Sequence, residues 1–572
     1  MPDRLSRRRL EAEGNTVDLN IRIAGQAGQG VQSAGVLLAG ALAEAGLHVL
    51  STKCYMSRIR GGLNWFDIRI ADRRLWAGKD KADLLVALTP EAEEILGDEL
   101  AGGGLIVFDG QGDGSAVCID MEEVATQVGG AKIMANSVAA GAAYSLLGYD
   151  VDQLANHLRE KLAGKGADVA EKNVACAREG AELARRSGAS LKAPQPCGAP
   201  RGIIAGSSAI GETACRAGLK FAAAYPMTPS TATFTYLAAN ADKFGMVVEQ
   251  AEDEIAAVNM ICGAAYAGAV SMATTSGGGF ALMVEGLALA GMMELPIVIL
   301  LGQRPGPATG QPTRTAQQDL KFALYAGHGE FPRAIYAPGT VEQCFTATRQ
   351  AIAAAHRYQT PVIILTDQFL QDMEQNIVPP ELGGPVDRCV AAGAGAEYRR
   401  YEVTASGVSP RAIPGGKARV ICDSDEHNEA GNISEDLHWR VAQQDKRMRK
   451  AGMMSAEALA PELYPGDGGR SAELLLVAWG STYGPCREAV DQLNAAGRDA
   501  AMLHFQQVWP INARVARQAL QGRKRVFSVE GNQTGQFASL LREAGLAREL
   551  ALVTRYDGLP FTAEYIIDRL EG

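Results

Sequence analysis

Short apolar runs and longer segments of helical periodicity alternate along this chain, which is the pattern of repeated strand and helix units. A short apolar run bounded by turn residues is typical of a strand buried on both faces of a parallel sheet. Such strands are predicted at residues 18–24, 48–52, 105–109, 221–224, 269–275, 297–302, 360–367, 474–479, 500–505 and 525–529. Helices are predicted between several of them, at residues 31–45 and 280–293 and from 482 to 496. The chain is therefore expected to have a multidomain α/β fold.

The stretch from residue 247 to 279 combines a polar cluster with a tightly packed helix. Four carboxylates fall within the six residues 249–254, and a segment rich in Ala and Gly follows them. Apolar side chains recur at helical spacing after Glu254, at Ala257, Val258, Ile261 and Ala265. This spacing predicts that the Glu254 carboxylate lies on the inward face of the helix. A buried carboxylate needs a structural partner or a ligand nitrogen; the alternative is a carboxylate that only stabilises the helix N-terminus.

Two turns carry polar groups or bare backbone at the ends of predicted strands. The first is Y-P-M-T-P-S-T at residues 225–231, in which two prolines fix the backbone and several hydroxyls and amides lie beyond the strand. A helix that begins after Ser230 would add its N-terminal dipole, so the corner is suited to a carboxylate; a plain helix-capping turn is the alternative. The second is S-G-G-G at residues 276–279, where glycines allow a close approach of a neighbouring group.

Arg304 lies in the loop Q-R-P-G-P-A-T-G-Q-P-T, residues 303–313, which follows the strand at 297–302. An arginine held in such a loop can form a bidentate pair with a carboxylate. The alternative is that Arg304 caps the carbonyl groups of its own loop. The loop is therefore a candidate anion site.

Composition narrows the classes of function. The 572 residues allow about three to four domains of ordinary size. The 55 basic and 65 acidic residues give a net charge of −10, which is poorly matched to nucleic acid. The ten cysteines are scattered without a C-x-x-C pair, which predicts reduced thiols and no iron–sulfur, zinc or disulfide set. The longest apolar runs have strand length and no apolar segment follows the basic N-terminus, so we expect a cytoplasmic protein without a membrane span.

These motifs together resemble a known family. The pattern E-x-x-A-A-x-x-x-x-G from Glu254 to Gly263, followed by a strand and S-G-x-G, resembles the pyrimidine-binding half of thiamine-diphosphate enzymes. With Y-P-M-T-P-S-T and the Arg304 loop, the chain is similar to the α subunit of the 2-oxoacid:ferredoxin oxidoreductases, and most to the 2-oxoglutarate members. The resemblance implies oxidative decarboxylation of 2-oxoglutarate to succinyl-CoA with electron transfer to ferredoxin, or the reverse carboxylation.

The same resemblance implies roles for individual residues. Glu254 is implied to be the catalytic residue, through a hydrogen bond to the N1′ atom of the cofactor's aminopyrimidine. Arg304 is implied to hold the substrate carboxylate. The residues implied to line the cofactor, besides Glu254, are Ser276, Gly277 and Gly278, and those implied to bind the substrate are Thr228, Ser230, Arg304 and Thr313.

The N-terminal module carries a glycine-rich turn, G-Q-A-G-Q-G at residues 25–30, between a predicted strand and helix. Such a turn lets the backbone approach a phosphate or a neighbouring loop, although its spacing is not the G-x-G-x-x-G of dinucleotide sites. With R-G-G at 60–62 the module resembles the γ domain of the same oxidoreductases, which usually has Gly in place of Ala27. The resemblance implies that Arg58 and Arg60 contact CoA phosphates; surface ion pairs are the alternative.

The domain organisation follows from these modules and from the polar segments between them. Residues 381–470 include the acidic run 423–429, which lacks metal-ligand spacing, so we expect a solvated loop or partner-facing arm with a charged helix face at 445–450. The last module resembles a transketolase C-terminal-type domain. The expected division is a flexible tail at 1–16, a γ-type domain at 17–190, a linker at 191–201, a pyrimidine-type thiamine-diphosphate domain at 202–380, the polar arm at 381–470 and the transketolase C-terminal-like domain at 471–572.

A module for the diphosphate and Mg²⁺ is not evident. G-D-G occurs at 112–114 and 466–468, but in loops and not at the end of a buried strand, so we interpret both as chance matches. The resemblance then implies a site shared with a β subunit that carries Mg²⁺ and a [4Fe-4S] cluster, in an (αβ)₂ heterotetramer that uses CoA and ferredoxin, with no metal on this chain. Two alternatives stay open: a non-redox carboligase of the acetolactate synthase kind, and a non-catalytic assembly subunit.

Overall fold

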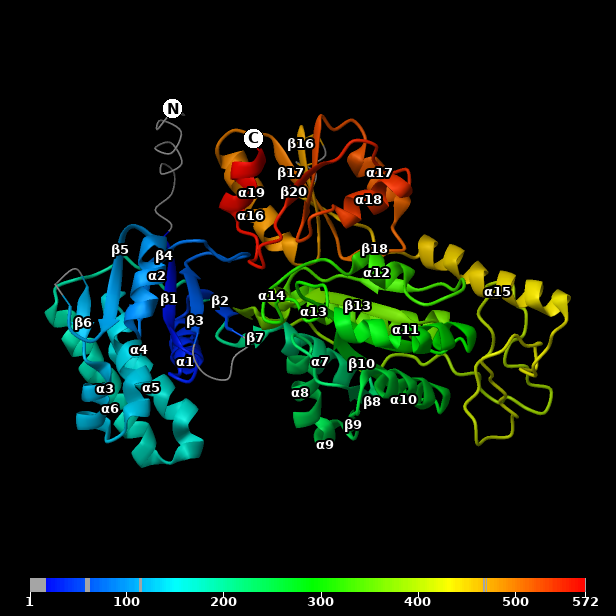
Figure 1. Ribbon diagram of the computed structural model, residues 1–572, viewed down its shortest axis with the longest axis horizontal. Helices are drawn as coiled ribbons and strands as arrows, with labels where there is room; N and C mark the ends of the chain where they lie inside the picture. Colours follow the sequence, from blue (N-terminus) through cyan, green and yellow to red (C-terminus); the bar gives the residue numbers. More distant parts are fainter. Residues whose placement is uncertain (1–16, 57–61, 113–115, 467–468, 470, 571–572) are drawn as a thin grey trace. The chain divides into compact units, whose positions relative to one another are not determined.

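A computed structural model describes residues 17–56, 62–112, 116–466, 469 and 471–570 (Figure 1). The chain divides into two compact units. Unit 1 comprises residues 1–205 and 372–378, and unit 2 comprises residues 206–371 and 379–572. Both contain strands alternating with helices, which confirms the predicted α/β class. Each unit is described separately below.

Unit 1 is built on an eight-stranded sheet with the order β6-β5-β4-β1-β3-β2-β14-β7. Strand β1 pairs in parallel with β4 and antiparallel with β3, so the sheet is mixed. Its strands are β1 (Asp18–Gln26), β2 (His48–Cys54), β3 (Leu63–Ala71), β4 (Ala82–Ala87), β5 (Leu100–Asp109), β6 (Val117–Ile119), β7 (Ile203–Ala205) and β14 (Glu374–Asn376). Its helices are α1 (Val31–Glu44), α2 (Pro90–Leu96), α3 (Met121–Val124), α4 (Ala135–Leu146), α5 (Val151–Leu162) and α6 (Ala167–Arg186). The predicted glycine-rich turn thus joins β1 to α1.

Two short strands of unit 1 come from sequence that was assigned to the next domain. We expected residues 202–380 to form one domain, but β14 pairs antiparallel with both β2 and β7 in the sheet of unit 1. The Asn376 side chain fixes this return, because its Oδ1 accepts from the Val49 amide at 2.8 Å and its Nδ2 donates to the Leu47 carbonyl at 2.7 Å. Asn376 is buried, so these bonds satisfy amide groups that have no access to water.

Unit 2 contains a seven-stranded sheet with the order β18-β12-β13-β11-β10-β8-β9. All neighbouring strands are parallel except β18, which pairs antiparallel with β12. The strands are β8 (Leu219–Ala224), β9 (Val247–Gln250), β10 (Val270–Ser276), β11 (Ile297–Gln303), β12 (Ala334–Tyr336), β13 (Val362–Asp367) and β18 (Gln507–Trp509). The helices are α7 (Gly206–Arg216), α8 (Thr231–Ala239), α9 (Ala241–Phe244), α10 (Glu254–Tyr266), α11 (Gly277–Met292), α12 (Leu320–Tyr325), α13 (Val341–Tyr358) and α14 (Gln368–Asp372).

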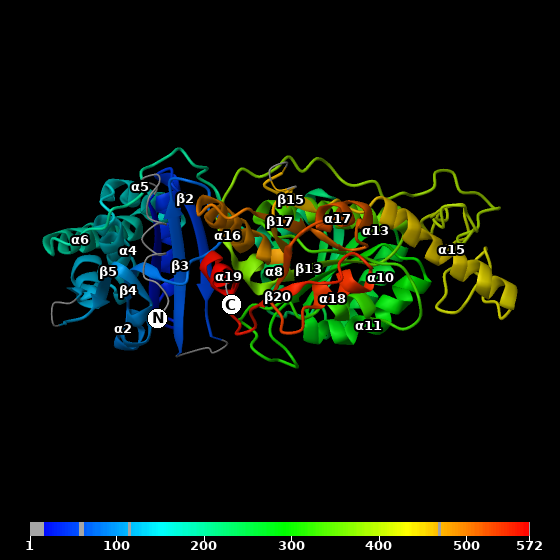
Figure 2. The ribbon, with the colours of Figure 1, turned by 90° about the horizontal axis from the view of Figure 1, so that it is seen from above.

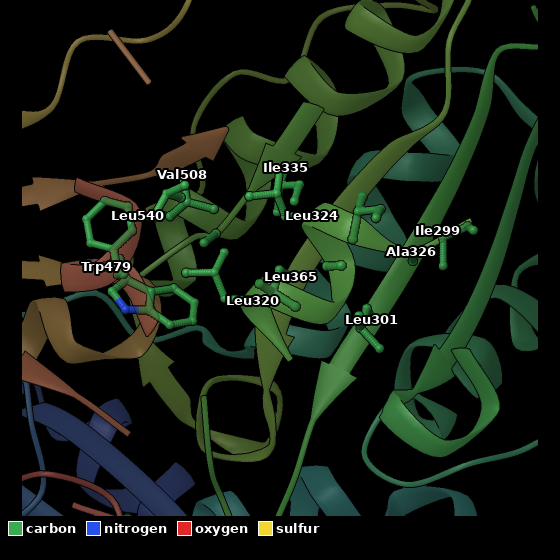
Figure 3. Close-up of a cluster of buried hydrophobic side chains, with 14 of the residues drawn as sticks. Ile299, Leu301, Leu320, Leu324, Ala326, Ile335, Leu365, Trp479, Val508 and Leu540 are labelled. Atoms are coloured by element: carbon green, nitrogen blue, oxygen red, sulfur yellow. The ribbon is translucent and has the colours of Figure 1, made fainter. Parts of the chain in front are cut away.

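A second sheet of unit 2 has the order β15-β17-β16-β19-β20 and shares a hydrophobic core with the first. Trp479 and Leu540 of this sheet and its helices belong to the same buried cluster as Leu301 and Leu365 (Figure 3). The strands are β15 (Glu462–Tyr464), β16 (Leu474–Trp479), β17 (Ala500–Phe505), β19 (Arg525–Glu530) and β20 (Ala551–Thr554). The helices are α16 (Tyr483–Ala495), α17 (Ala513–Leu520), α18 (Gln536–Glu543) and α19 (Ala563–Leu570).

The polar arm contains the long helix α15 (Leu437–Ala456), which extends past the ends of α10 and α11 in both views (Figures 1 and 2). The charged helix face expected at residues 445–450 lies on α15, but three of its charged side chains are buried. Lys446, Arg447 and Lys450 are at most 2% exposed. The Lys446 and Lys450 ammonium groups lie 2.6 Å and 2.5 Å from the two carboxylate oxygens of Glu294, which follows α11. The two lysines face inward because their ammonium groups pair with the buried carboxylate, whereas sequence periodicity alone predicts that they face solvent.

Candidate active site

Glu254 begins α10 and points into unit 2. Asp253 caps the helix, because its side chain accepts from the Ala256 amide at 2.7 Å. Glu254 is 3% exposed, and the four apolar positions predicted to share its face are fully buried. The inward orientation inferred from helical spacing is therefore confirmed. The Glu254 Oε1 atom is buried and has no hydrogen-bond partner within the chain. A buried carboxylate oxygen without a partner is the arrangement expected where a ligand supplies the donor.

The S-G-G-G turn lies directly against this carboxylate. Strand β10 ends at Ser276 and α11 begins at Gly277, so the glycines form the first turn of the helix, earlier than the start at 280 that we predicted. A Cβ atom at Gly279 would lie 2.4 Å from Glu254 Oε1, so only glycine permits the approach of the carboxylate. Around Gly278 the nearest atom to such a Cβ would be 3.9 Å away, so this position opens toward space. The Ser276 hydroxyl is buried without a hydrogen-bond partner.

The Y-P-M-T-P-S-T corner joins β8 to α8, and Thr228 and Ser230 within it have different surroundings. Helix α8 begins at Thr231, as predicted, but the Ser230 side chain does not cap it. The Ser230 hydroxyl is buried and donates to the Thr275 carbonyl, which ties the corner to the end of β10. Thr228 is half-buried, and its carbonyl accepts a 2.8 Å hydrogen bond from the Arg304 guanidinium. The structure thus brings Thr228 and Arg304 together and engages Ser230 with backbone.

Arg304 directly follows β11 and is half-buried. Burial lowers the pKa of its guanidinium, and the carboxylate of Asp319 opposes that shift. Thr313 lies buried in the same loop. Because one guanidinium nitrogen is occupied by the Thr228 carbonyl, the other N–H groups of Arg304 keep the capacity to hold an anion. The predicted alternative, an arginine that caps its own loop, is not what the contacts show, since the carbonyl belongs to a different turn.

Two residues between the Arg304 loop and α12 carry no sequence motif. Gln317 is 2% exposed and clasps the second sheet: its Nε2 donates to the Trp479 carbonyl at 2.9 Å, and its Oε1 accepts from the Gly531 amide at 2.8 Å. The Gln317 amide also donates to the Gly531 carbonyl at 2.7 Å. The second residue, Asp319, lies against the glycine turn, because a Cβ atom at Gly277 would be 2.6 Å from its Oδ2. A lone Gln or Asp in a loop carries no sequence signal that distinguishes it from a solvated residue.

Unit 1 has a separate cavity of about 700 Å³ at the glycine-rich turn. Residues 26–33 line one side, where Gly28 and Gly30 have φ values of 97° and 81°. The Asn136 side chain lies against Gly30, so a Cβ at that position would be 2.0 Å from its Nδ2. The glycine-rich turn thus lines this cavity at the start of α1, where the sequence predicts a close approach of a phosphate or a neighbouring loop. Arg58 and Arg60, the candidate CoA contacts, lie outside the described residues, as do parts of both G-D-G segments.

Within residues 17–56, 62–112, 116–466, 469 and 471–570, no three His, Cys, Asp or Glu side chains converge in a way that could hold a metal ion. None of the described helices is both long enough and apolar enough to cross a bilayer.

Sequence families match both units. Residues 212–446 match the family described as "Pyruvate flavodoxin/ferredoxin oxidoreductase, thiamine diP-bdg", and residues 20–183 match "Pyruvate ferredoxin/flavodoxin oxidoreductase". The first match covers the Glu254 helix, the glycine turn and the Arg304 loop. The fold and the site therefore define a thiamine-diphosphate-binding domain of the oxidoreductase class, joined to a second domain of the same enzymes.

Whole-chain comparisons identify the family. The 2-oxoacid:ferredoxin oxidoreductase subunit alpha of a Sulfolobus species is 30% identical over 96% of each chain. The 2-oxoglutarate oxidoreductase subunit KorA of Mycobacterium tuberculosis is 30% identical over 96% of this chain and 90% of that protein. A solved structure, 2-oxoglutarate:ferredoxin oxidoreductase from Magnetococcus marinus with 2-oxoglutarate, coenzyme A and succinyl-CoA bound, matches with a TM-score of 0.90 and 33% identity over 97% of this chain and 99% of that chain. The chain belongs to the 2-oxoacid:ferredoxin oxidoreductase family, as an α subunit that includes the γ-type domain.

Proposed function

We propose that this α subunit serves a 2-oxoglutarate:ferredoxin oxidoreductase, which converts 2-oxoglutarate and CoA to succinyl-CoA and CO₂ or runs the reverse carboxylation. The observation that carries the proposal is the buried Glu254 Oε1, which has no partner and lies at the glycine turn. The Thr228 and Arg304 corner is a second polar site of the same unit. A carboxylate that needs a donor and an arginine with free N–H groups are the two elements that a 2-oxoacid decarboxylase of this class requires.

The roles of the residues follow from their chemistry. Glu254 would share a proton with the N1′ atom of thiamine diphosphate, because its buried oxygen favours a hydrogen-bonded partner over water. Ser276, Gly277 and Gly278 would line the cofactor, and the buried Ser276 hydroxyl lacks a partner that a ligand would provide. Thiamine diphosphate, when bound, supplies the electron sink for decarboxylation. This chain then supplies orientation, a dry site and charge.

Arg304 and Thr228 would bind the 2-oxoacid carboxylate. The guanidinium is already oriented by the Thr228 carbonyl at 2.8 Å, so little side-chain entropy is lost when the substrate binds. Thr313, buried in the same loop, would contact the distal end of 2-oxoglutarate, and Ser230 would act by holding the corner against β10. The preference for 2-oxoglutarate is supported by the M. tuberculosis relative and by the structure with that substrate bound.

A β subunit would complete the site. We propose that it carries the diphosphate, Mg²⁺ and a [4Fe-4S] cluster, and that the complex is an (αβ)₂ heterotetramer in the cytoplasm that reduces ferredoxin. Exposed apolar side chains on the helices that bear the site support an interface there: Ile255 and Met260 of α10 and Leu282 of α11 are 49%, 38% and 48% exposed. CoA would approach the glycine-rich turn of unit 1, with Arg58 and Arg60 as candidate phosphate contacts.

The central test is Glu254→Gln in the complex purified with its β subunit. We expect 2-oxoglutarate-dependent dye reduction to fall by roughly 10²- to 10⁴-fold, the range in which a single acid or base residue contributes. Glu252→Gln is the matched control, because Glu252 is exposed and two residues away. Near-normal activity of the Glu254 variant would remove its catalytic role and favour a non-catalytic assembly subunit.

A second test addresses the carboxylate clamp. Arg304→Lys keeps the positive charge but loses the bidentate fork, so KM for 2-oxoglutarate should rise by about tenfold or more while kcat changes less. An unchanged KM would show that the substrate carboxylate binds elsewhere. The co-purifying chain should contain G-D-G and four clustered cysteines; thiamine diphosphate bound stably to the α chain alone would instead favour a self-contained carboligase.

A further inference from the structure

Asp319 is a carboxyl group of the site that has no assigned role. It precedes α12, and its amide donates to the Gln303 side chain at 3.0 Å, which fixes its backbone beside the end of β11. Both of its carboxylate oxygens lie against the glycine turn, 2.6 Å and 2.9 Å from where a Cβ of Gly277 would be. Its Oδ2 is buried and accepts no hydrogen bond. A structural aspartate at a helix start normally caps the helix, but the Asp319 side chain makes no capping bond.

Few charged groups surround this carboxyl. Arg304 acts on it from the end of β11 through its charge, with no hydrogen bond between the two side chains among the described residues. Glu254 reaches the same glycine turn from α10, at Gly279. Lys321 of α12 is engaged elsewhere, because its ammonium group lies 2.9 Å from Glu543. The charge of Asp319 is therefore balanced only through space by Arg304, the same group that is proposed to receive the substrate carboxylate.

The two possible states of Asp319 have opposite effects on an incoming anion. Ionised Asp319 offers only acceptors and adds a negative charge beside the anion that Arg304 holds. Protonated Asp319 lacks that charge and has an O–H group, which can donate a hydrogen bond to a carboxylate or keto oxygen. Burial raises the pKa of Asp319 to about 6, with Arg304 opposing the shift, so protonation near neutral pH requires little free energy. An anion that occupies Arg304 would weaken this opposition and favour the protonated form further.

We propose that Asp319 is a positioning residue of the substrate clamp, which takes up one proton when a 2-oxoacid carboxylate binds Arg304. This inference rests on the proposed function of Arg304. No covalent step is involved: the proton comes from solvent and is bound by an Asp319 oxygen, and it is released when the substrate leaves. Binding of the 2-oxoacid is then strongest below the pKa of Asp319 and weakens as the pH rises above it.

The test measures 2-oxoglutarate binding to the complex of this chain with its β subunit, purified without thiamine diphosphate so that no turnover occurs. Titration calorimetry between pH 5.5 and 8.5, in two buffers of different ionisation enthalpy, reports both the affinity and the number of protons taken up. We expect the dissociation constant to rise by up to tenfold per pH unit above about pH 6, with uptake of close to one proton at pH 7 to 8.

Asp319→Asn is the decisive variant, because asparagine keeps the shape and cannot ionise. We expect it to bind 2-oxoglutarate up to about a hundredfold more tightly than the unmodified complex at pH 8, with a flat pH profile and no proton uptake. Glu330→Gln, an exposed carboxylate of unit 2, is the control for removal of a negative charge and should keep the original profile. An Asp319→Asn complex with the original pH profile and proton uptake would overturn the inference.

Failure of this inference and failure of the clamp are distinguishable. If Arg304→Lys weakens 2-oxoglutarate binding while Asp319→Asn leaves its pH dependence unchanged, Arg304 binds the substrate and Asp319 does not couple to it. If Arg304→Lys leaves affinity unchanged at every pH, the clamp itself is refuted and the inference falls with it. The melting temperature of the Asp319→Asn complex, measured in parallel, shows whether the variant is folded.

Discussion

The anchoring of the polar arm leads to a quantitative prediction for Glu294→Gln. Glu294 and the ammonium groups of Lys446 and Lys450 are each at most 1% exposed, and Arg400 donates to the Glu294 carbonyl at 2.9 Å. Burial alone would raise the pKa of Glu294, but the charges of Lys450, Lys446 and Arg400 outweigh it and hold the pKa well below its usual range. Glu294 is therefore ionised at neutral pH, and its charge compensates two buried cations.

The magnitude follows from what the variant leaves behind. Glutamine has the same shape but no charge, so two ammonium groups stay buried beside a guanidinium. Breaking a buried ion pair by removing one partner destabilises by about 3–5 kcal/mol. Burial already lowers the pKa of Lys450, and that of Lys446 to about 8, so a lysine can lose its proton in the variant. A neutral buried lysine still costs about 5 kcal/mol at pH 7 relative to the opened segment, in which its pKa returns to 10.5. We therefore expect the free energy of local opening of α15 to be about 3–5 kcal/mol lower in the variant than in the unmodified chain.

Hydrogen exchange resolved to α15 is the suitable assay, since a chain of several domains does not unfold in a single two-state step. The expected change corresponds to roughly 150- to 5,000-fold faster exchange of the α15 amides that open locally, with the strands of unit 1 unaffected. Glu285→Gln is the control: Glu285 is 82% exposed beside His328, and surface substitutions change stability by about 0.5 kcal/mol or less. Equal α15 exchange in the two variants would refute the anchoring.

Three further predictions concern the site. Gln317→Ala removes the partner of the buried Gly531 amide and one hydrogen bond to Trp479, so the free energy of unfolding should fall by about 2–4 kcal/mol. The denaturation midpoint of unit 2 measures this change, and an unchanged midpoint would contradict a stabilising role of Gln317. Gly279→Ala places a methyl group 2.4 Å from Glu254 Oε1, so calorimetry should detect weaker binding of thiamine diphosphate to the αβ complex. Gly263→Ala is the control and should leave that affinity unchanged, because no atom lies within 4 Å of the added methyl group. Burial raises the pKa of Asp319 from 3.8 to about 6, so the stability of the unmodified chain is greatest below pH 3.8 with respect to this group and declines as the pH rises through 6. Asp319→Asn should therefore raise the melting temperature at pH 8 relative to the unmodified chain and change it less at pH 4.

Local patterns predicted most of the elements that carry the site. The strands at 474–479 and 500–505 have the predicted bounds, because a short apolar run between turn residues leaves little choice of start and end. The burial of Glu254 was likewise predictable, since the apolar spacing that follows it fixes one inward face of the helix. These features depend only on neighbours within a few turns of chain.

Contacts between distant segments were not predictable in this way. Ser230 offers a hydroxyl suited to a substrate, but its partner is a carbonyl 45 residues away, and no periodicity marks that pairing. The cations at 446 and 450 follow the spacing of a solvated face, and only the position of Glu294 turns them inward. Gln317 and Asp319 are single polar residues in a loop, so their importance depends on which turns of the fold come to lie beside them.

The return of β14 to the first sheet has a consequence for biosynthesis. Strand β7 lies at the edge of the sheet and pairs with β14, which separates it from β2; β14 ends at Asn376. The ribosome must therefore extend the chain from residue 205 to 378 before unit 1 can close, which takes roughly 10–35 s at about 5–20 residues per second. During that interval the nascent second unit can form its first strands while the edge of β2 still lacks its partner. An unpaired strand edge can pair with other chains, so the β2 edge is the surface on which we expect chaperone binding.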